Sequence, residues 1–552
     1  MLIVLFTSGN VIGQKARLPE TINSYEKVFV PLLTADGKFL YIDRKNYPGN
    51  TGSIGDHDDI WRSRIIRPED FGAYDTISVP LQEKELSLLL NDKSMIDIEK
   101  FYKSKLKPSN GSTNSIFTDS ISFLEPENLG SPLNTTGSDV LFSITPDGTK
   151  ALVYGIYEPF TGLKRQGFSI SKLIGGKWAF PEPLDIEGYY NNPVRKNGYS
   201  TVFFYGSMSS DCSVLILALN RDEGLGDLDL YVSFHIGGNK WTTPRNLGSI
   251  INTGKTESSP FLALDGKTLY FASDGRDDST MLDLYMTRRL DDTWANWSEP
   301  VSLGHAINSE FDEKGICLNA LGSEVYIVSR DTSVKRYGIY KADLPDFARP
   351  GPYTIYTGNF FSVKGSHLKY HNEIVKVALF NGNDSLPYYT TEIEGSQYTL
   401  CTSAERGIRI RFESRGCKPV EFVSEIKNSI KPEIIKKDIL FSEIEKSKTI
   451  RLTLLFDYDS DLVTDSAIAA LSGFIKSNPG IREITITGHA DESGTTGYNM
   501  DLSMRRARNI QKALLQSGIA GDIIKVSWQG SKSPVSADLS RNRRVEIEAV
   551  IE

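Results

Sequence analysis

A carboxylate and a guanidinium stand fifteen positions apart near the end of the chain, where regular elements are expected to end and begin. Asp491 follows the alternating segment EITITGHA, which predicts a strand over 483–490. Arg506 stands in a segment with apolar residues three to five positions apart, which predicts a helix that stops at Gly518. For an arbitrary Asp and Arg, the simplest interpretation is a surface salt bridge between loop and helix.

The residues around this pair change that interpretation. The segment ITGHADESGTTGYNMDLSMRRARNIQKALLQSGI, followed by NRRVEI at 542–547, resembles the C-terminal domain of the OmpA family. The positions that carry the resemblance are Ala490-Asp491, Gly494, Asn499, Leu502-Ser503, Arg506-Ala507 and Asn542 to Ile547. Ala490 stands where the family usually has Thr, so one small polar contact is expected to be absent.

This resemblance implies a binding site for peptidoglycan. The family binds diaminopimelate, whose side chain ends in an ammonium and a carboxylate on one carbon. The resemblance assigns Asp491 to the ammonium and Arg506 to the carboxylate, and a zwitterion does require one fixed anion and one bidentate cation. Arg505 and Arg508 do not fit the spacing of the motif.

Three further residues belong to the expected peptidoglycan-binding set. Asn499 either caps the helix or touches the ligand, and both readings remain open. Leu502 lies on the same helix. Arg544, with Asn542 and Arg543, either lines the site or fixes the last strand.

The first two thirds of the chain contain a repeated motif, [WF]-x-x-P-x-x-L-G-x-x-[IL]-N-[TS], at 123–135, 241–253 and 297–309, with a decayed copy from Trp178. Thirteen residues after the Asn, a turn such as Asp265-Gly266 begins and an apolar strand follows. Asn23 precedes the same pattern without the rest of the motif. Small sheets of this kind cannot bury both faces alone, so the units must stack as in a β-propeller.

The repeat resembles the TolB-type, WD40-like propeller and implies such a domain over 15–350. Five units are recognisable, but Asp36 and Asp147 are 111 residues apart, so the sequence leaves five or six blades open. The segment 82–105 predicts a helical insertion.

The remaining segments complete a multidomain architecture. Short alternating strands over 353–426 predict a small β-sandwich that resembles the carboxypeptidase regulatory-like domain. The Lys- and Glu-rich stretch 427–448 is expected to be a linker or an entry strand, and 449–552 an α/β OmpA-like domain. The apolar residues 1–14 resemble a secretory signal, although a buried first strand is the alternative.

Composition and motifs argue against several functional classes. The net charge of −8 with no basic stripe argues against nucleic-acid binding. The four cysteines form no CxxC, so a zinc ribbon is excluded, and reduced thiols are favoured over a Cys401–Cys417 bridge. The six histidines have no metal-ligand spacing, Gly248–Thr256 departs from the P-loop pattern, and the acidic run 56–59 is expected to be solvated. The sequence therefore predicts no cofactor, metal or catalytic residue.

Together these features predict a non-catalytic adaptor of the cell envelope, located in the periplasm and associated with peptidoglycan and the outer membrane. The propeller is expected to bind an outer-membrane or periplasmic protein. Similar Bacteroidota chains suggest, by analogy, an accessory role in type IX secretion. The alternatives are a cell-wall-acting enzyme that the OmpA-like domain targets to the wall, and a purely structural tether.

Overall fold

The computed structural model divides the chain into two compact units, Met1–Glu443 (unit 1) and Ile444–Glu552 (unit 2). The described residues are 15–23, 28–66 except 56, scattered positions from 79 to 101, 122–424 except 160–163, 197, 277–280 and 332–335, then 426, 430–444 and 448–551. The signal-like segment 1–14 and most of the expected helical insertion 82–105 lie outside them. Within the described residues, no helix has the length and apolar character needed to span a membrane.

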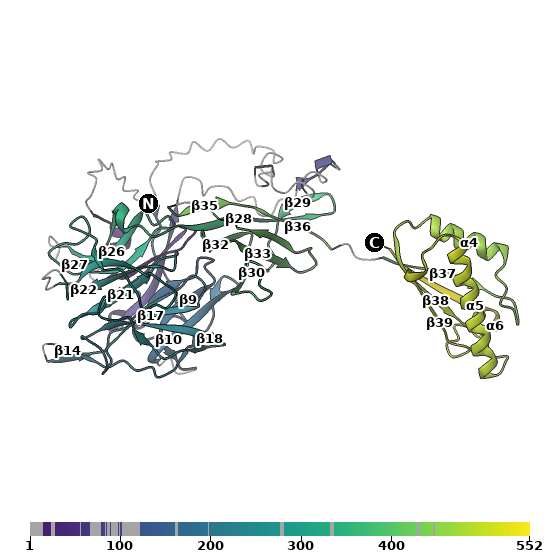
Figure 1. Cartoon of the computed structure of the whole chain (residues 1–552), viewed down its shortest axis with the longest axis horizontal. Coiled ribbons are helices and arrows are strands. Elements are labelled where there is room, and N and C mark those ends of the chain that lie inside the picture. Colours follow the sequence, from purple (N-terminus) through teal and green to yellow (C-terminus); the bar gives the residue numbers. More distant parts are fainter. Residues whose placement is uncertain are drawn as a thin grey trace. The chain divides into compact units, whose positions relative to one another are not determined.

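Unit 1 begins with five sheets built mainly from antiparallel strands (Figure 1). The first contains β2 (Val28–Leu33), β3 (Phe39–Lys45), β4 (Asp58–Ile66), β6 (Ser122–Phe123) and β7 (Glu127–Asn128). The second contains β8 (Leu141–Ile144), β9 (Lys150–Tyr157), β10 (Lys164–Ile174), β11 (Lys177–Trp178) and β12 (Glu182–Pro183). The third contains β16 (Tyr205–Met208), β17 (Val214–Leu219), β18 (Asp229–Gly237), β19 (Lys240–Trp241), β20 (Arg245–Asn246) and, in parallel with β19, β13 (Asp185–Ile186).

The last two sheets follow the same plan. The fourth contains β21 (Glu257–Leu262), β22 (Thr268–Ser273), β23 (Asp283–Arg288) and β24 (Val301–Ser302). The fifth contains β25 (Glu313–Leu318), β26 (Glu324–Asp331) and β27 (Arg336–Asp343), and β1 (Ala16–Arg17) pairs with β27. A hairpin of β14 (Val194–Lys196) and β15 (Tyr199–Thr201) lies between β13 and β16 in sequence.

One edge strand of each of the five sheets contacts an edge strand of the next sheet, in a closed order. β2 touches β8, β8 touches β16, β16 touches β21, β21 touches β25, and β25 touches β2. The pairing of β1 with β27 ties the beginning of the described chain to its fifth sheet. Among the described residues, therefore, five sheets form a ring of contacts.

The asparagine of the repeated motif joins neighbouring sheets. Oδ1 of Asn252 accepts a hydrogen bond from the Leu230 N–H (2.7 Å), and its Nδ2 donates to the Leu230 carbonyl (3.0 Å). Leu230 belongs to β18, whereas Asn252 precedes β21 of the next sheet. The same exchange joins Asn134 to Ile60, Asn308 to Leu284 and Asn23 to Ile339. The decayed copy differs, because Asn191 bonds Asn220 and Phe203 instead.

The rest of unit 1 is a two-sheet sandwich. One sheet contains β28 (Tyr353–Lys364), β29 (His367–Tyr370), β32 (Gln397–Ser403) and β5 (Val79–Pro80). The other contains β30 (Val375–Asn381), β31 (Tyr389–Ile393), β33 (Ile408–Ser414) and β34 (Val420–Val423). Buried aromatic side chains, including Phe360, Tyr398 and Phe412, form the core between them.

The stretch 427–448, expected to be a linker or an entry strand, contains strands that belong to the sandwich. It contains β35 (Glu433–Lys436) and β36 (Ile439–Ser442), and both pair in parallel with β28. The three apolar residues at 439–441 are buried in the sandwich, which explains why this short strand pairs despite its Lys- and Glu-rich flanks. The sandwich therefore extends beyond residue 426 to the end of unit 1.

Unit 2 is an α/β domain with the sheet order β37-β40-β38-β39. Its strands are β37 (Lys448–Leu455), β38 (Ile481–Gly488), β39 (Ile524–Trp528) and β40 (Arg544–Ile551). Its helices are α4 (Asp465–Lys476), α5 (Thr496–Gln516) and the short α6 (Leu539–Asn542). Helix α5 buries Ile510 and Leu514 against the sheet, and Gly488 allows the close approach, since a Cβ there would lie 2.1 Å from the Ser503 carbonyl oxygen.

Candidate ligand-binding site

Three chain segments meet beside Asp491 in unit 2. The residue follows β38, Arg543 directly precedes β40, and the loop 456–464 connects β37 with α4. Hydrogen bonds join the segments, because Arg543 donates from Nε to the Phe456 carbonyl (3.3 Å) and from Nη1 to Asp491 Oδ2 (3.0 Å). The candidate site is therefore held by the ends of strands and not by one loop alone.

Asp491 is a nearly buried, ionised carboxylate. Its exposed fraction is 6%, and its Oδ1 accepts hydrogen bonds from the backbone N–H of Ser493 (3.1 Å) and from the Ser493 hydroxyl. Burial alone would raise the pKa of this carboxyl, but the hydrogen bonds from Ser493 and Arg543 outweigh burial and hold the pKa below its ordinary value. The group is thus a fixed anion at neutral pH.

Arg506 lies at the same end of the sheet but is completely buried (0% exposed). Its Nε donates to the Ser460 carbonyl (2.7 Å), its Nη1 to the His489 carbonyl (3.0 Å) and its Nη2 to the Asp457 carbonyl (3.1 Å). Burial lowers the pKa of Arg506 to about 10, while the charge of Asp491 opposes that shift. Arg506 is therefore protonated at neutral pH and joins the loop 456–464 to the end of β38. Direct contact with a ligand requires its covering groups to move.

The other expected site residues have mainly structural contacts. Asn499 is buried and its Nδ2 donates to the Gly494 carbonyl (3.0 Å), whereas Thr495 caps α5 by accepting from the Tyr498 N–H (3.3 Å). Leu502 is buried in α5. Arg544 donates to Glu546 (2.7 Å) and to the Ser533 carbonyl, and no hydrogen bond to Asp491 is recorded. These residues shape the loops around the site.

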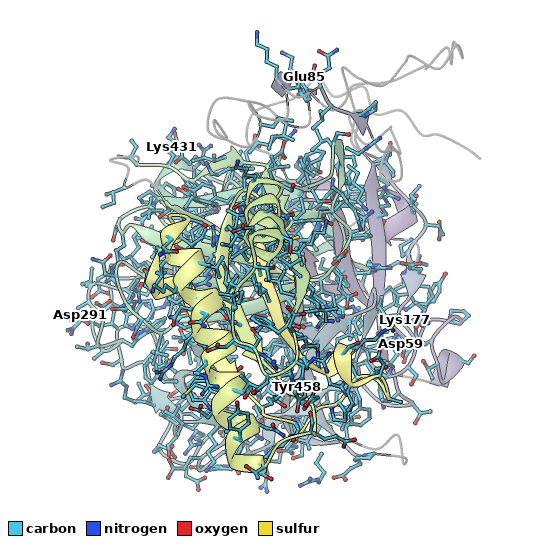
Figure 2. The ribbon with its side chains drawn as sticks, turned by 90° about the vertical axis from the view of Figure 1, so that its right-hand side faces the viewer. Asp59, Glu85, Lys177, Asp291, Lys431 and Tyr458 are labelled. Carbon is cyan, nitrogen blue, oxygen red and sulfur yellow. The ribbon has the colours of Figure 1, made fainter. Side chains whose placement is uncertain are left out.

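Arg543 is the cation that contacts Asp491, and sequence reasoning did not single it out from Arg544. Its side chain keeps 18% of its surface exposed. Its guanidinium also lies 5.9 Å from the ring centre of Tyr458, a residue with a 68% exposed side chain that Figure 2 labels. The alternation of buried and partly exposed residues in β40 could have separated the two arginines, because adjacent residues of a strand face opposite sides of the sheet.

His489 is a buried group whose ring nitrogens have no hydrogen-bond partner within the described part of unit 2. Burial lowers its pKa, the charge of Arg544 acts in the same direction, and Glu546 opposes it, with 3.8 Å between His489 Nε2 and the Glu546 carboxylate. His489 is therefore neutral at pH 7. The described residues contain no group of three or more His, Cys, Asp or Glu side chains placed to hold a metal ion.

Comparison with known proteins identifies the C-terminal domain as OmpA-like. The family model described as "OmpA family" matches residues 455–548. The peptidoglycan-associated lipoprotein of Pseudomonas aeruginosa is 34% identical over 101 residues, which cover 17% of this chain and 60% of that protein. The peptidoglycan-associated lipoprotein of Legionella pneumophila is 33% identical over 100 residues, which cover 17% of this chain and 56% of that protein. The chain thus spans somewhat less than two thirds of these relatives.

A solved structure adds one further likeness. The crystal structure of the peptidoglycan-associated lipoprotein from Burkholderia pseudomallei is 31% identical, covers 18% of this chain and 87% of that chain, and superposes with a TM-score of 0.16.

Proposed function

We propose that the protein is a non-catalytic adaptor of the cell envelope that binds peptidoglycan through its OmpA-like domain. The observation that carries the proposal is the carboxylate of Asp491, fixed beside two guanidinium groups in a domain that the OmpA family model matches. The matched relatives named as peptidoglycan-associated lipoproteins support this ligand. The proposed location is the periplasm, in association with peptidoglycan and the outer membrane.

The proposed binding step exchanges one cation for another at Asp491. The ammonium of a diaminopimelate side chain replaces Arg543 Nη1 as the partner of Asp491 Oδ2. The released Arg543 guanidinium then faces the carboxylate on the same carbon of the ligand, since a bidentate cation suits that group. Arg506, the partner that the motif assigns to the ligand carboxylate, reaches it when the loop 456–464 moves away from the guanidinium.

We also propose that the five sheets of unit 1 are the blades of a β-propeller that binds a protein partner. The ring of contacts among β2, β8, β16, β21 and β25 supports this architecture. The motif asparagines support it as well, because Asn23 joins the first sheet to the fifth. In the adaptor, the OmpA-like domain holds the wall and the propeller engages an outer-membrane or periplasmic protein, with type IX secretion as the proposed context.

Sedimentation of the full-length protein with purified sacculi tests the wall-binding proposal. Asp491→Asn preserves the shape of the side chain and removes its charge, and Arg543→Ala removes its cation. We expect both variants to bind at least roughly tenfold more weakly, because each leaves an opposite charge of the site or ligand unpaired. Asp522→Asn and Arg541→Ala are matched controls on exposed residues of the same unit and are expected to bind like the wild type. Unchanged sedimentation of Asp491→Asn would refute the site.

A further inference from the structure

Unit 1 contains a cavity of about 390 Å³ that its five-sheet ring and its sandwich line together. The ring contributes the turns β8–β9, β16–β17 and β21–β22, and the sandwich contributes residues from β30, β32 and the adjoining loops. This volume lies within the range of small-molecule sites, and ligand sites favour junctions of this kind.

Three equivalent turns each place an aspartate at this junction. Two of these aspartates accept a hydrogen bond from the sandwich or from the segment that leads into the sandwich. Asp147 Oδ2 accepts a hydrogen bond from the Tyr389 hydroxyl (2.5 Å), and Asp265 Oδ2 accepts one from the Gly351 N–H (2.7 Å). Asp211 occupies the same place in the turn between β16 and β17. Its Oδ1 accepts bonds from its own turn, at Ser209 and Ser213, but no hydrogen bond to its Oδ2 is recorded among the described residues.

The turn that carries Asp211 also departs from its equivalents in sequence. The other four turns place Gly in the left-handed conformation, with φ between 61° and 72°, whereas Cys212 adopts φ 57° in the third sheet. A residue with a side chain rarely adopts this conformation. The Cys212 side chain packs against buried residues of both the sandwich and the ring, so it holds the turn that carries Asp211 at their junction.

The sandwich side of the cavity holds a second group without a partner. Thr402 is only 2% exposed, and its Oγ1 has no hydrogen-bond partner among the described residues. The basic residues of the lining are already paired, because Lys267 lies 2.7 Å from Glu405, and Arg289 and Arg406 lie 2.8 Å and 3.9 Å from Asp292. Asp211 Oδ2 is therefore left as an acceptor for a cation from outside the chain.

We propose that this cavity binds a small organic cation through a primary amine, with the Asp211 carboxylate as its counter-ion. The ammonium donates to Asp211 Oδ2, and a rotation of the Thr402 side chain, whose Oγ1 is buried, would let that hydroxyl bond a further polar atom of the ligand. Leu379 and Leu400, which also line the cavity, accommodate the apolar part of the ligand. The lining consists of residues of unit 1, so the proposal does not rest on wall binding.

The test uses benzylamine and benzyl alcohol, which have similar shape and differ in charge, with the full-length protein and saturation-transfer NMR. We expect wild type to bind benzylamine, and Asp211→Asn to weaken this binding by roughly 10- to 100-fold while leaving the weaker binding of benzyl alcohol unchanged. Asp36→Asn alters an equivalent turn that does not line the cavity, so it is expected to bind like the wild type. Equal affinity for the two probes, or unchanged benzylamine binding by Asp211→Asn, would overturn the proposal.

Hydrogen–deuterium exchange of the wild-type protein provides a measurement that needs no variant. Saturating benzylamine is expected to slow exchange at 209–213 and 400–406, and to leave the equivalent turn at 34–38 unchanged. Absence of protection at both segments, or the same protection with benzyl alcohol, contradicts the proposed site even if Asp211→Asn does not fold.

Discussion

Replacement of Asn252 by Ala tests whether the repeated motif holds unit 1 together. The side chain is 1% exposed and exchanges two hydrogen bonds with Leu230 of the preceding sheet, while its Nδ2 also donates to Asn246 Oδ1 (2.8 Å). The Leu230 carbonyl keeps a second donor, the Leu247 N–H, whereas the Leu230 N–H loses Asn252 Oδ1 as its acceptor. The substitution therefore leaves one buried donor unpaired and removes two further hydrogen bonds.

The expected loss of stability follows from these contacts. An unpaired buried N–H costs about 1–3 kcal/mol and each lost hydrogen bond about 1 kcal/mol, so the free energy of unfolding should fall by roughly 3–5 kcal/mol. Urea unfolding followed by tryptophan fluorescence measures this change in unit 1, because five of the six tryptophans lie there. Asn239→Ala is the control, because Asn239 is exposed in the turn between β18 and β19. Equal stability of the two variants would refute the bridging role of the motif.

Three further predictions concern charged groups. Lys15→Ala removes the partner of the buried Glu313 carboxylate and should destabilise unit 1 by roughly 3–5 kcal/mol in thermal melts, whereas Lys172→Ala, from an exposed pair, should cost less than about 1 kcal/mol. Burial lowers the pKa of His489 in the folded state. As the pH falls below about 6.5, His489 is therefore protonated in the unfolded state before it is protonated in the folded state, and unit 2 should lose stability towards pH 5. The His489→Gln variant should show a weaker dependence of unfolding free energy on pH than the wild type, and an equal dependence in both proteins would contradict this role of His489. Because the pKa of Asp491 lies below its ordinary value, sacculus binding by the His489→Gln variant, which lacks the histidine effect, should be equal at pH 7 and pH 4.5, and a loss at pH 4.5 argues against this carboxylate.

The sequence predicted those features of the fold that depend on local pattern. The alternating strands, the turn at Asp265-Gly266 and the order of elements in 449–552 follow from spacing and from turn residues. The sequence did not predict the role of Asn252, because its hydrogen-bond partner Leu230 in β18 comes within reach only when two sheets pack together. A strand within 427–448 was one of two expectations, but the pairing of β36 with β28 could not be predicted, since only three apolar residues mark the strand within a charged stretch.

The candidate site shows the same limit. The resemblance to the OmpA family selected Asp491 and Arg506, and the fold brings both to one end of the sheet in unit 2. The burial of Arg506 depends on the carbonyls of Asp457, Ser460 and His489, which come from two loops whose paths the sequence does not specify. The choice between Arg543 and Arg544 depends on which face of β40 each one takes, and that register is set by pairing with β37 and β38.

Burial does not remove the electrostatic effect of Arg506, because its hydrogen-bond partners are neutral carbonyls. A guanidinium paired with a carboxylate is largely cancelled, whereas this one keeps a full charge and, with its pKa near 10, stays protonated at neutral pH. Its field acts on Asp491 and on anything bound beside it, and low-dielectric surroundings strengthen that field. Asp491 offers a fixed anion to a ligand ammonium, and Arg506 and Arg543 offer cations to a ligand carboxylate. A ligand with an ammonium alone engages only the first of these groups, so the paired charges favour a zwitterion over a simple amine.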